Sequence, residues 1–192
     1  MNNLIRERKG MLILSLLVIL LPMGVGLFLW NQLPDQVPIH FGLNGQADNY
    51  AGKAFVVFGL PLLMAALQVL LLVVTMADPK GKNIAAKPFG LLLWICPLVS
   101  LFCGTMTYAK ALALPVDINL VGGLFLGLMF LVVGNYLPKC KQTYTVGIRL
   151  PWTLADEDNW AYTHRLAGKV WTIGGLVILA LTFLRLPVLQ FF

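Results

Sequence analysis

The chain has 192 residues, of which 59% are hydrophobic and 11% are charged, and its formal net charge is +6. Soluble domains carry roughly 25% charged residues, so this composition excludes a sizeable water-soluble domain. The positive charge would suit nucleic acid, but the basic residues follow the connections between apolar runs and form no single stripe on a soluble face. We therefore expect one membrane domain over residues 1–192 and no direct binding of nucleic acid.

Five apolar runs, free of Asp, Glu, Lys, Arg and His, occupy most of the chain. A helix of roughly 20 apolar residues spans the hydrocarbon core and satisfies its own backbone groups. The sequence thus predicts an all-α, polytopic membrane bundle of about five transmembrane helices, at residues 11–30, 54–76, 89–109, 118–137 and 170–184. The first run is too long for a signal-peptide core and lacks an Ala-x-Ala cleavage site, so we expect it to be retained.

Small residues recur along one side of the fourth run. Gly123 and Gly127 are four residues apart, and Gly134 follows one heptad later. Such spacing lets helix backbones approach closely in a membrane. It predicts tight packing against a neighbouring helix rather than a ligand site.

Basic residues divide unequally between the two sets of connections. Only Lys53, Lys110 and Arg185 fall on one side; the N-terminal side holds Arg6, Arg8, Lys9, Lys80, Lys82, Lys87, Lys139, Lys141, Arg149, Arg165 and Lys169. Short cytoplasmic loops are enriched in Lys and Arg. We therefore predict a multi-pass protein of the cell membrane with a cytoplasmic N-terminus and an extracellular C-terminus.

Two connections are long and rich in Gly, Pro and polar residues. The first, residues 31–53, is the motif segment and is expected outside. Alternating Val37, Ile39 and Phe41 predict a short strand with one face on the membrane surface or the bundle, and Asn44-Gly45 predicts a tight turn. The residues considered for a ligand site are Pro34, Asp35, Pro38, His40, Gly45, Asp48 and Lys53.

Three polar residues of the motif segment admit several interpretations. His40, Asp35 and Asp48 could form a metal site or an acid–base pair, but the ligand set is thin. Carboxylates on a glycine-containing loop more often form turns and caps, so a structural role is favoured. Recognition of a peptide is a third possibility.

The second long connection, residues 138–169, is the signature segment and is expected inside. Thr153 and Asp156 match a capping box, which predicts a helix beginning near Leu154. Its apolar side predicts an interfacial helix lying on the inner leaflet, with a bend into the last span at Gly168. Its basic residues could bind anionic lipid, neutralise the acidic cluster at 156–158 or hold a protein partner; they are Lys139, Lys141, Arg149 and Arg165.

Both segments together resemble one family. Residues 33–53, LPDQVPIHFGLNGQADNYAGK, resemble an external bacterial motif of the form LPD-x-VP-x-H-x-x-x-x-G-x-x-D, and residues 134–168 resemble the signature of the SdpI immunity family. The signature positions that match are Gly134, Asn135, Pro138, Lys139, Gly147, Ile148, Arg149, Pro151, Trp152, Thr153, Leu154, Trp160, Thr163, His164, Arg165 and Gly168.

The resemblance implies an integral membrane protein that protects a bacterium against a secreted, membrane-active killing peptide. It also implies signalling, in which the membrane protein draws a cytoplasmic transcriptional repressor to the membrane. The family pattern further implies a sixth span after the signature, whereas this sequence ends at Phe192.

Other functions are less well supported by the residues. A small transporter or channel would need ionisable groups at membrane depth, and the apolar runs have none. A scaffold for other membrane proteins stays open. No His-Glu-x-x-His motif or activated nucleophile appears, so we expect neither an enzyme nor a cofactor or metal.

Overall fold

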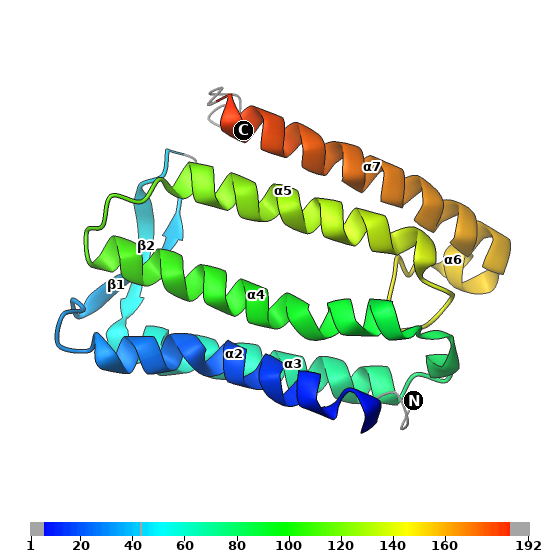
Figure 1. Ribbon diagram of the computed structural model, residues 1–192, viewed down its shortest axis with the longest axis horizontal. Helices are drawn as coiled ribbons and strands as arrows, with labels where there is room; N and C mark the ends of the chain where they lie inside the picture. Colours follow the sequence, from blue (N-terminus) through cyan, green and yellow to red (C-terminus); the bar gives the residue numbers. More distant parts are fainter. Residues whose placement is uncertain (1–5, 43, 185–192) are drawn as a thin grey trace.

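The computed structural model describes residues 6–42 and 44–184. Within them, five helical segments are long and apolar enough to cross a membrane, and they run side by side (Figure 1). These are α2 (Lys9–Phe28), α3 (Leu60–Met76, continuing the π-helical turn η1, Phe55–Gly59), α4 (Ala86–Ala111), α5 (Ile118–Tyr136) and α7 (Glu157–Phe183). The predicted polytopic helical bundle is confirmed.

Shorter elements gather at the two ends of the bundle (Figure 1). One end, here the hairpin end, carries strands β1 (Gln36–Phe41) and β2 (Ala47–Gly52). The other, the signature end, carries the 3₁₀ turns η2 (Gly81–Asn83) and η3 (Leu137–Lys139) and the short helix α6 (Pro151–Ala155). The motif and signature segments therefore lie at opposite ends of the molecule.

The last helix differs from its prediction. α7 begins at Glu157 and runs without interruption to Phe183, so the bend expected at Gly168 is wrong. Its N-cap is Asp156, whose carboxylate accepts from the N–H groups of Asp158 (2.7 Å) and Asn159 (3.1 Å). Thr153 lies inside α6, so the helix start near Leu154 is also wrong. The helix that precedes the last span is α6 alone.

Helices α2, α3 and α4 form one packed group. Its buried side chains include Ile19 of α2, and Phe89 and Leu93 of α4. Three side chains hydrogen-bond to carbonyls of a neighbouring helix: Ser100 Oγ to Ile19 O (2.9 Å), Tyr108 Oη to Pro22 O (2.9 Å) and Gln68 Nε2 to Leu93 O (3.3 Å). Polar groups in hydrocarbon need such partners, and these bonds fix the three helices against one another.

Helices α5 and α7 form a second group, packed backbone to backbone. A Cβ on Gly127 would lie 3.2 Å from the carbonyl oxygen of Gly175, and one on Gly134 would lie 3.0 Å from that of Gly168. Only glycine permits this approach, which confirms the predicted packing role of the small residues. Gly123 faces Thr182 in the same contact.

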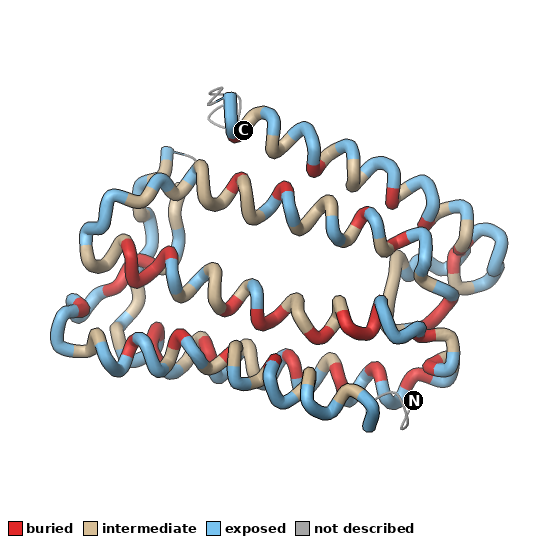
Figure 2. The backbone as a smooth tube through the Cα atoms, in the orientation of Figure 1, coloured by how far each residue is buried: buried red, intermediate tan, exposed pale blue. Residues whose placement is uncertain are grey.

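The two groups touch each other little along their length. The clearest contact between α4 and α5 is the stacked pair Phe102 and Phe125, with ring centroids 4.1 Å apart. Exposed residues cover the outward sides of the helices, whereas buried residues follow their contacts (Figure 2). Many of these exposed residues are large and apolar, as Leu17, Leu70 and Leu128 illustrate, which suits a surface facing lipid.

The hairpin docks on the α2–α4 group. β1 pairs antiparallel with β2, with register irregularities between Pro38 and Phe41. Val37 is fully buried and packs with Leu33, Val56, Val57 and Tyr108. The predicted strand and its contact with the bundle are thus confirmed, although Pro38 is buried beside Val37 and the strict alternation fails.

Candidate functional site

The turn of the hairpin has the backbone conformation and hydrogen bonds of a tight turn. Gly45 adopts a φ of +72°, a conformation that glycine reaches without strain. The N–H of Gly42 donates to Gln46 O (2.9 Å), and the Asn44 side chain accepts from Gln46 N (3.0 Å). The predicted turn at Asn44-Gly45 is therefore confirmed.

Polar residues of the motif segment form two separate pairs. His40 Nδ1 lies 2.5 Å from Asp48 Oδ1 across the hairpin, and Lys53 Nζ lies 2.8 Å from Asp35 Oδ1 at its open end. The Lys53 ammonium hydrogen-bonds the Asp35 carboxylate and lowers its pKa. Both pairs close the hairpin, which fits the structural role favoured from the sequence. Among the described residues, no group of three His, Cys, Asp or Glu could hold a metal.

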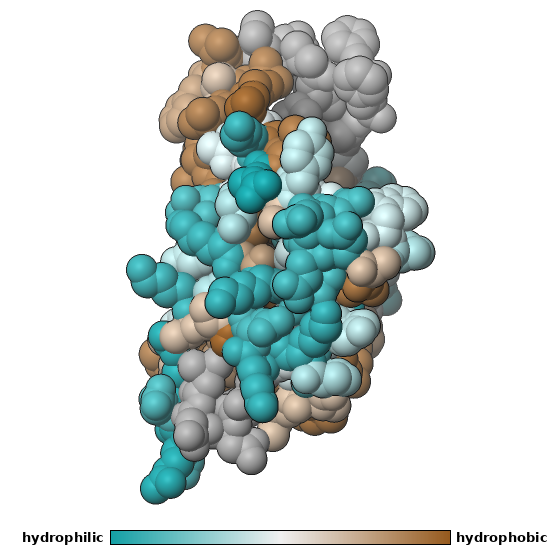
Figure 3. All heavy atoms as spheres, turned by 90° about the vertical axis from the view of Figure 1, so that its right-hand side faces the viewer, coloured by the Kyte–Doolittle hydropathy of each residue, from teal (hydrophilic) through white to brown (hydrophobic). Residues whose placement is uncertain are grey.

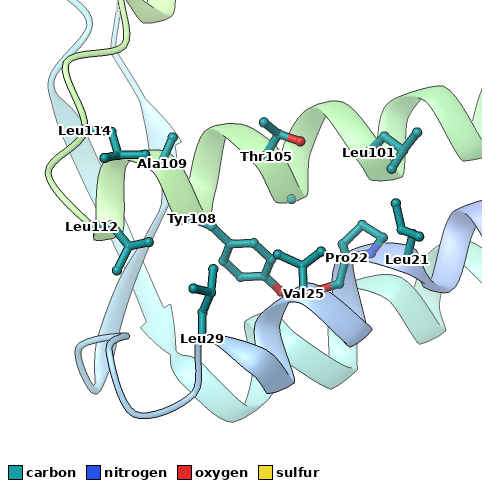
Figure 4. Close-up of a pocket in the computed structure, with 11 residues that line it drawn as sticks. Leu21, Pro22, Val25, Leu29, Leu101, Thr105, Tyr108, Ala109, Leu112 and Leu114 are labelled. Atoms are coloured by element: carbon teal, nitrogen blue, oxygen red, sulfur yellow. Dashed lines mark hydrogen bonds between the residues drawn. The ribbon is translucent and has the colours of Figure 1, made fainter.

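An apolar pocket of about 230 Å³ lies beside the hairpin, between α2 and α4. Tyr108 points across it towards Pro22 and Val25, and Leu29 and Leu112 lie nearer the hairpin (Figure 4). A second pocket, of about 200 Å³, lies behind Tyr108 and reaches Ile39 of β1 and Val56 of η1. The hairpin end therefore offers apolar recesses that the sequence did not reveal.

Several signature residues build the loop that precedes α6. Trp160 and His164, one turn apart on α7, stack with ring centroids 4.0 Å apart, and both are buried. Trp160 Nε1 donates to Cys140 O (2.8 Å). His164 Nε2 accepts from the N–H of Ile148 (2.9 Å), and its Nδ1 lies 2.8 Å from Trp160 O. These partners require the neutral imidazole with its proton on Nδ1.

Gly147 is needed where the loop crosses these two rings. Its φ is +122°, and a Cβ there would lie 2.5 Å from His164 Nε2 and 2.6 Å from the Trp160 ring. No larger residue fits that space. Gly147, Trp160 and His164 therefore act together in folding the loop.

Thr153 fastens α6 to the loop. Its fully buried hydroxyl donates to Ile148 O (2.8 Å) and accepts from Leu150 N (2.9 Å). The Gln142 side chain reaches the same turn, with Nε2 2.8 Å from Thr153 O and 3.1 Å from Leu154 O. α6 is therefore held in place by two side chains, its own Thr153 and Gln142 of the preceding loop.

A network missed by the sequence analysis joins this loop to the α3–α4 connection. Asp78 is buried, and its carboxylate accepts from the Tyr144 N–H (2.9 Å), the Thr145 hydroxyl (2.7 Å) and the Lys80 N–H (2.8 Å). Lys80 Nζ also bonds the Gln142 side chain. Asn83 Nδ2 donates to Gln142 O (2.8 Å).

The remaining signature candidates lie on the surface. Trp152 is 56% exposed although tryptophan favours burial, and the exposed Arg149 donates to Tyr144 O (3.0 Å). Thr163 is half-buried; the other exposed positions are Asn135, Pro138, Lys139, Pro151 and Arg165. The signature thus separates into residues that build the loop and residues available to a partner. In the motif segment, Pro34 is likewise exposed.

Two family models match the chain, one at each segment. A domain of unknown function, DUF1648, matches residues 17–65, and the SdpI/YfhL protein family matches residues 139–192. The immunity protein SdpI of Bacillus subtilis is 27% identical over 175 residues, which are 89% of this chain and 81% of that protein. The chain is therefore similar to the SdpI/YfhL family at its signature segment and to one immunity protein over most of its length. The match confirms the resemblance stated from the sequence, and no solved structure is significantly similar.

The two family matches cover the structural features described above. The match to the family model begins at Lys139, within η3, and so includes the Trp160–His164 stack and the Thr153 contacts. The match to DUF1648 includes the hairpin, which lies at the other end of the bundle (Figure 1). The sixth span implied by the family pattern would follow α7, and residues 185–192 lie outside the described part of the chain.

Proposed function

We propose that this chain is an integral membrane immunity protein that protects a bacterium against a secreted, membrane-active killing peptide. The supporting observation is its similarity to an immunity protein over 89% of its length. The proposal also takes up the predicted orientation, with the N-terminus and the signature end in the cytoplasm and the hairpin outside. On this orientation, the peptide meets the hairpin end.

The hairpin end suits an apolar peptide. Its two pockets are lined mostly by aliphatic and aromatic side chains, and they adjoin the hydrocarbon-facing sides of α2 and α4. Ile39 lines the second pocket from β1, so the hairpin contributes directly to a recess within the helices. A membrane-active peptide could bury apolar side chains there without leaving the bilayer.

The signature end suits a soluble partner. Trp152 and Arg149 are both exposed on or next to α6, and such residues are enriched at the centres of protein interfaces. We infer that this surface recruits a cytoplasmic repressor when the peptide is bound. Because α6 is held by Thr153 and Gln142, a change in the loop would move this surface as a unit.

Helices α3 and α4 connect the two ends. At the hairpin end, Tyr108 of α4 packs with Val37 of the hairpin. At the other end of the same helix, Phe89 and Leu93 pack with Leu72 of α3 and with Val146 of the signature segment. A ligand can transmit a signal only if it binds two arrangements with different affinity. The second and third spans are thus the physical route from the hairpin end to the signature end.

Protection is tested by expressing the chain in cells sensitive to the killing peptide and measuring survival. We expect survival to rise only in cells that express the chain. Unchanged killing, despite membrane insertion verified by fractionation, would contradict the immunity function.

Signalling is tested in the same strain with a reporter for the repressed promoter. Trp152→Ala and Arg149→Ala should abolish induction of the reporter while expression and insertion are retained, because both side chains are exposed. Lys82→Ala, an exposed basic residue of the same end outside the signature segment, is the matched control. Full induction by the Trp152 and Arg149 variants would argue against the proposed partner surface.

A further inference from the structure

The signature end carries positive charge that its own carboxylates do not neutralise. Among the described residues the ion pairs are His40–Asp48 and Lys53–Asp35, both at the hairpin end. Polar residues cover much of the signature end when it faces the viewer (Figure 3). Its exposed basic residues are Arg6, Lys9, Lys82, Lys87, Lys139, Lys141, Arg149, Arg165 and Lys169. A surface of this charge attracts anions.

Two of these lysines flank one groove between η3 and α7. The groove has a volume of about 500 Å³ and is lined by Gly134, Asn135, Pro138, Lys139, Gly168, Lys169, Thr172 and Ile173. Gly134 and Gly168 bring no side chain into it. Lys139 Nζ donates to Asn135 Oδ1 (3.2 Å) and lies 5.0 Å from the centre of the Tyr136 ring, so this ammonium is held at the groove.

The depth of the groove matches the boundary of the bilayer. Lys139 follows the apolar run of α5 by two residues, and Lys169 directly precedes the apolar part of α7. Ile173 lies one turn further along α7, is 61% exposed and lines the same groove. Cationic groups therefore lie at headgroup level, with an apolar wall continuing into the hydrocarbon region.

We propose that this groove binds one anionic phospholipid. Lys139 and Lys169 contact its phosphate, and the Asn135 amide, whose nitrogen has no partner among the described residues, donates a further hydrogen bond. An acyl chain lies along Ile173. The apolar wall favours a lipid over free phosphate, and two cations on one groove favour an anionic over a zwitterionic lipid.

The site is tested by native mass spectrometry of the delipidated protein in a non-ionic detergent, titrated with phosphatidylglycerol or phosphatidylcholine. We expect tighter binding of phosphatidylglycerol. Lys139→Gln combined with Lys169→Gln should weaken it by about 30-fold, the effect of removing two near-surface lysines. Lys139→Arg combined with Lys169→Arg should keep the affinity, and circular dichroism checks that each variant is folded.

A matched pair separates a defined site from general charge attraction. Lys82→Gln combined with Lys87→Gln removes the same charge from exposed positions at the same end, away from the groove. This pair should bind phosphatidylglycerol as the wild type does, and excess glycerol phosphate, which lacks acyl chains, should not compete. Equal losses in both glutamine pairs, equal affinity for the two lipids, or displacement by glycerol phosphate would each overturn the proposal.

Discussion

The contact between α5 and α7 makes a sharp prediction at Gly168. In Gly168→Ala the new Cβ would lie 2.6 Å from Pro138 Cγ and 2.8 Å from Gly134 O, which fall short of an ordinary 3.4 Å contact by 0.8 Å and 0.6 Å. Both neighbours are ring or backbone atoms that cannot rotate away. Overpacking of this kind costs about 1–3 kcal/mol, so the free energy of unfolding should fall by about that amount relative to a matched alanine variant.

Gly122 supplies the matched variant. It lies on α5, and a Cβ there would meet nothing within 4 Å. Both substitutions gain the same helix propensity, up to about 1 kcal/mol, so the difference between them isolates the helix contact. The measurement is the free energy of unfolding of both proteins in mixed micelles under increasing denaturing detergent. If Gly168→Ala were as stable as Gly122→Ala, the close approach of the two helices would be refuted.

Three further predictions concern the ends of the bundle. Asp78→Ala should lower the free energy of unfolding by about 1.5–3 kcal/mol for each hydrogen bond that water does not replace. Amide hydrogen exchange should then become faster in the signature segment but not in the hairpin, and a uniform change in exchange would count against the network. Thr153→Val should lower the free energy of chemical unfolding by about 1–3 kcal/mol, because the N–H of Leu150 loses its buried acceptor. An unchanged stability would contradict a stabilising role of the Thr153 hydroxyl. The Lys53 ammonium lowers the pKa of the Asp35 carboxyl below its unfolded value of 3.8. The pair therefore stabilises the hairpin fully above that value, and this stabilisation is lost as the pH falls through the lower pKa of the folded state. Asp35→Asn should remove the corresponding acid dependence of the hairpin amide shifts in NMR.

The membrane-spanning helices were predictable because the length and apolar composition of each run indicate a span without reference to the rest of the chain. Uncharged stretches of spanning length can satisfy their backbone only as helices in a bilayer, so four of the five spans fall close to their predicted limits. The stripe of Gly123, Gly127 and Gly134 was equally legible, since small residues at helical spacing permit close packing. The turn at Gly45 followed from local chemistry as well.

The contacts between distant segments were not predictable from local patterns. Asp78 bonds the backbone of Tyr144, 66 positions away, and nothing in the spacing of either connection indicates that pairing. Gly168 also shows that a local pattern does not identify distant contacts. Its lack of a side chain suggested a bend, but whether glycine bends a helix or admits a neighbour depends on what lies opposite it, which here is Pro138.

The arrangement of the helices also indicates where this protein can change shape. Each group is fixed internally, α2–α4 by side-chain bonds to helix carbonyls and α5–α7 by backbone contact, whereas α4 and α5 meet chiefly through Phe102 and Phe125. Packed groups move as rigid bodies about their weakest interface, so the least costly rearrangement is a shift of one group against the other. Such a shift would act directly on Asp78, which ties the α3–α4 connection to the signature loop. On the proposed function, a peptide that inserts between helices at the hairpin end would therefore be sensed at the opposite end, through the network that holds the proposed partner surface.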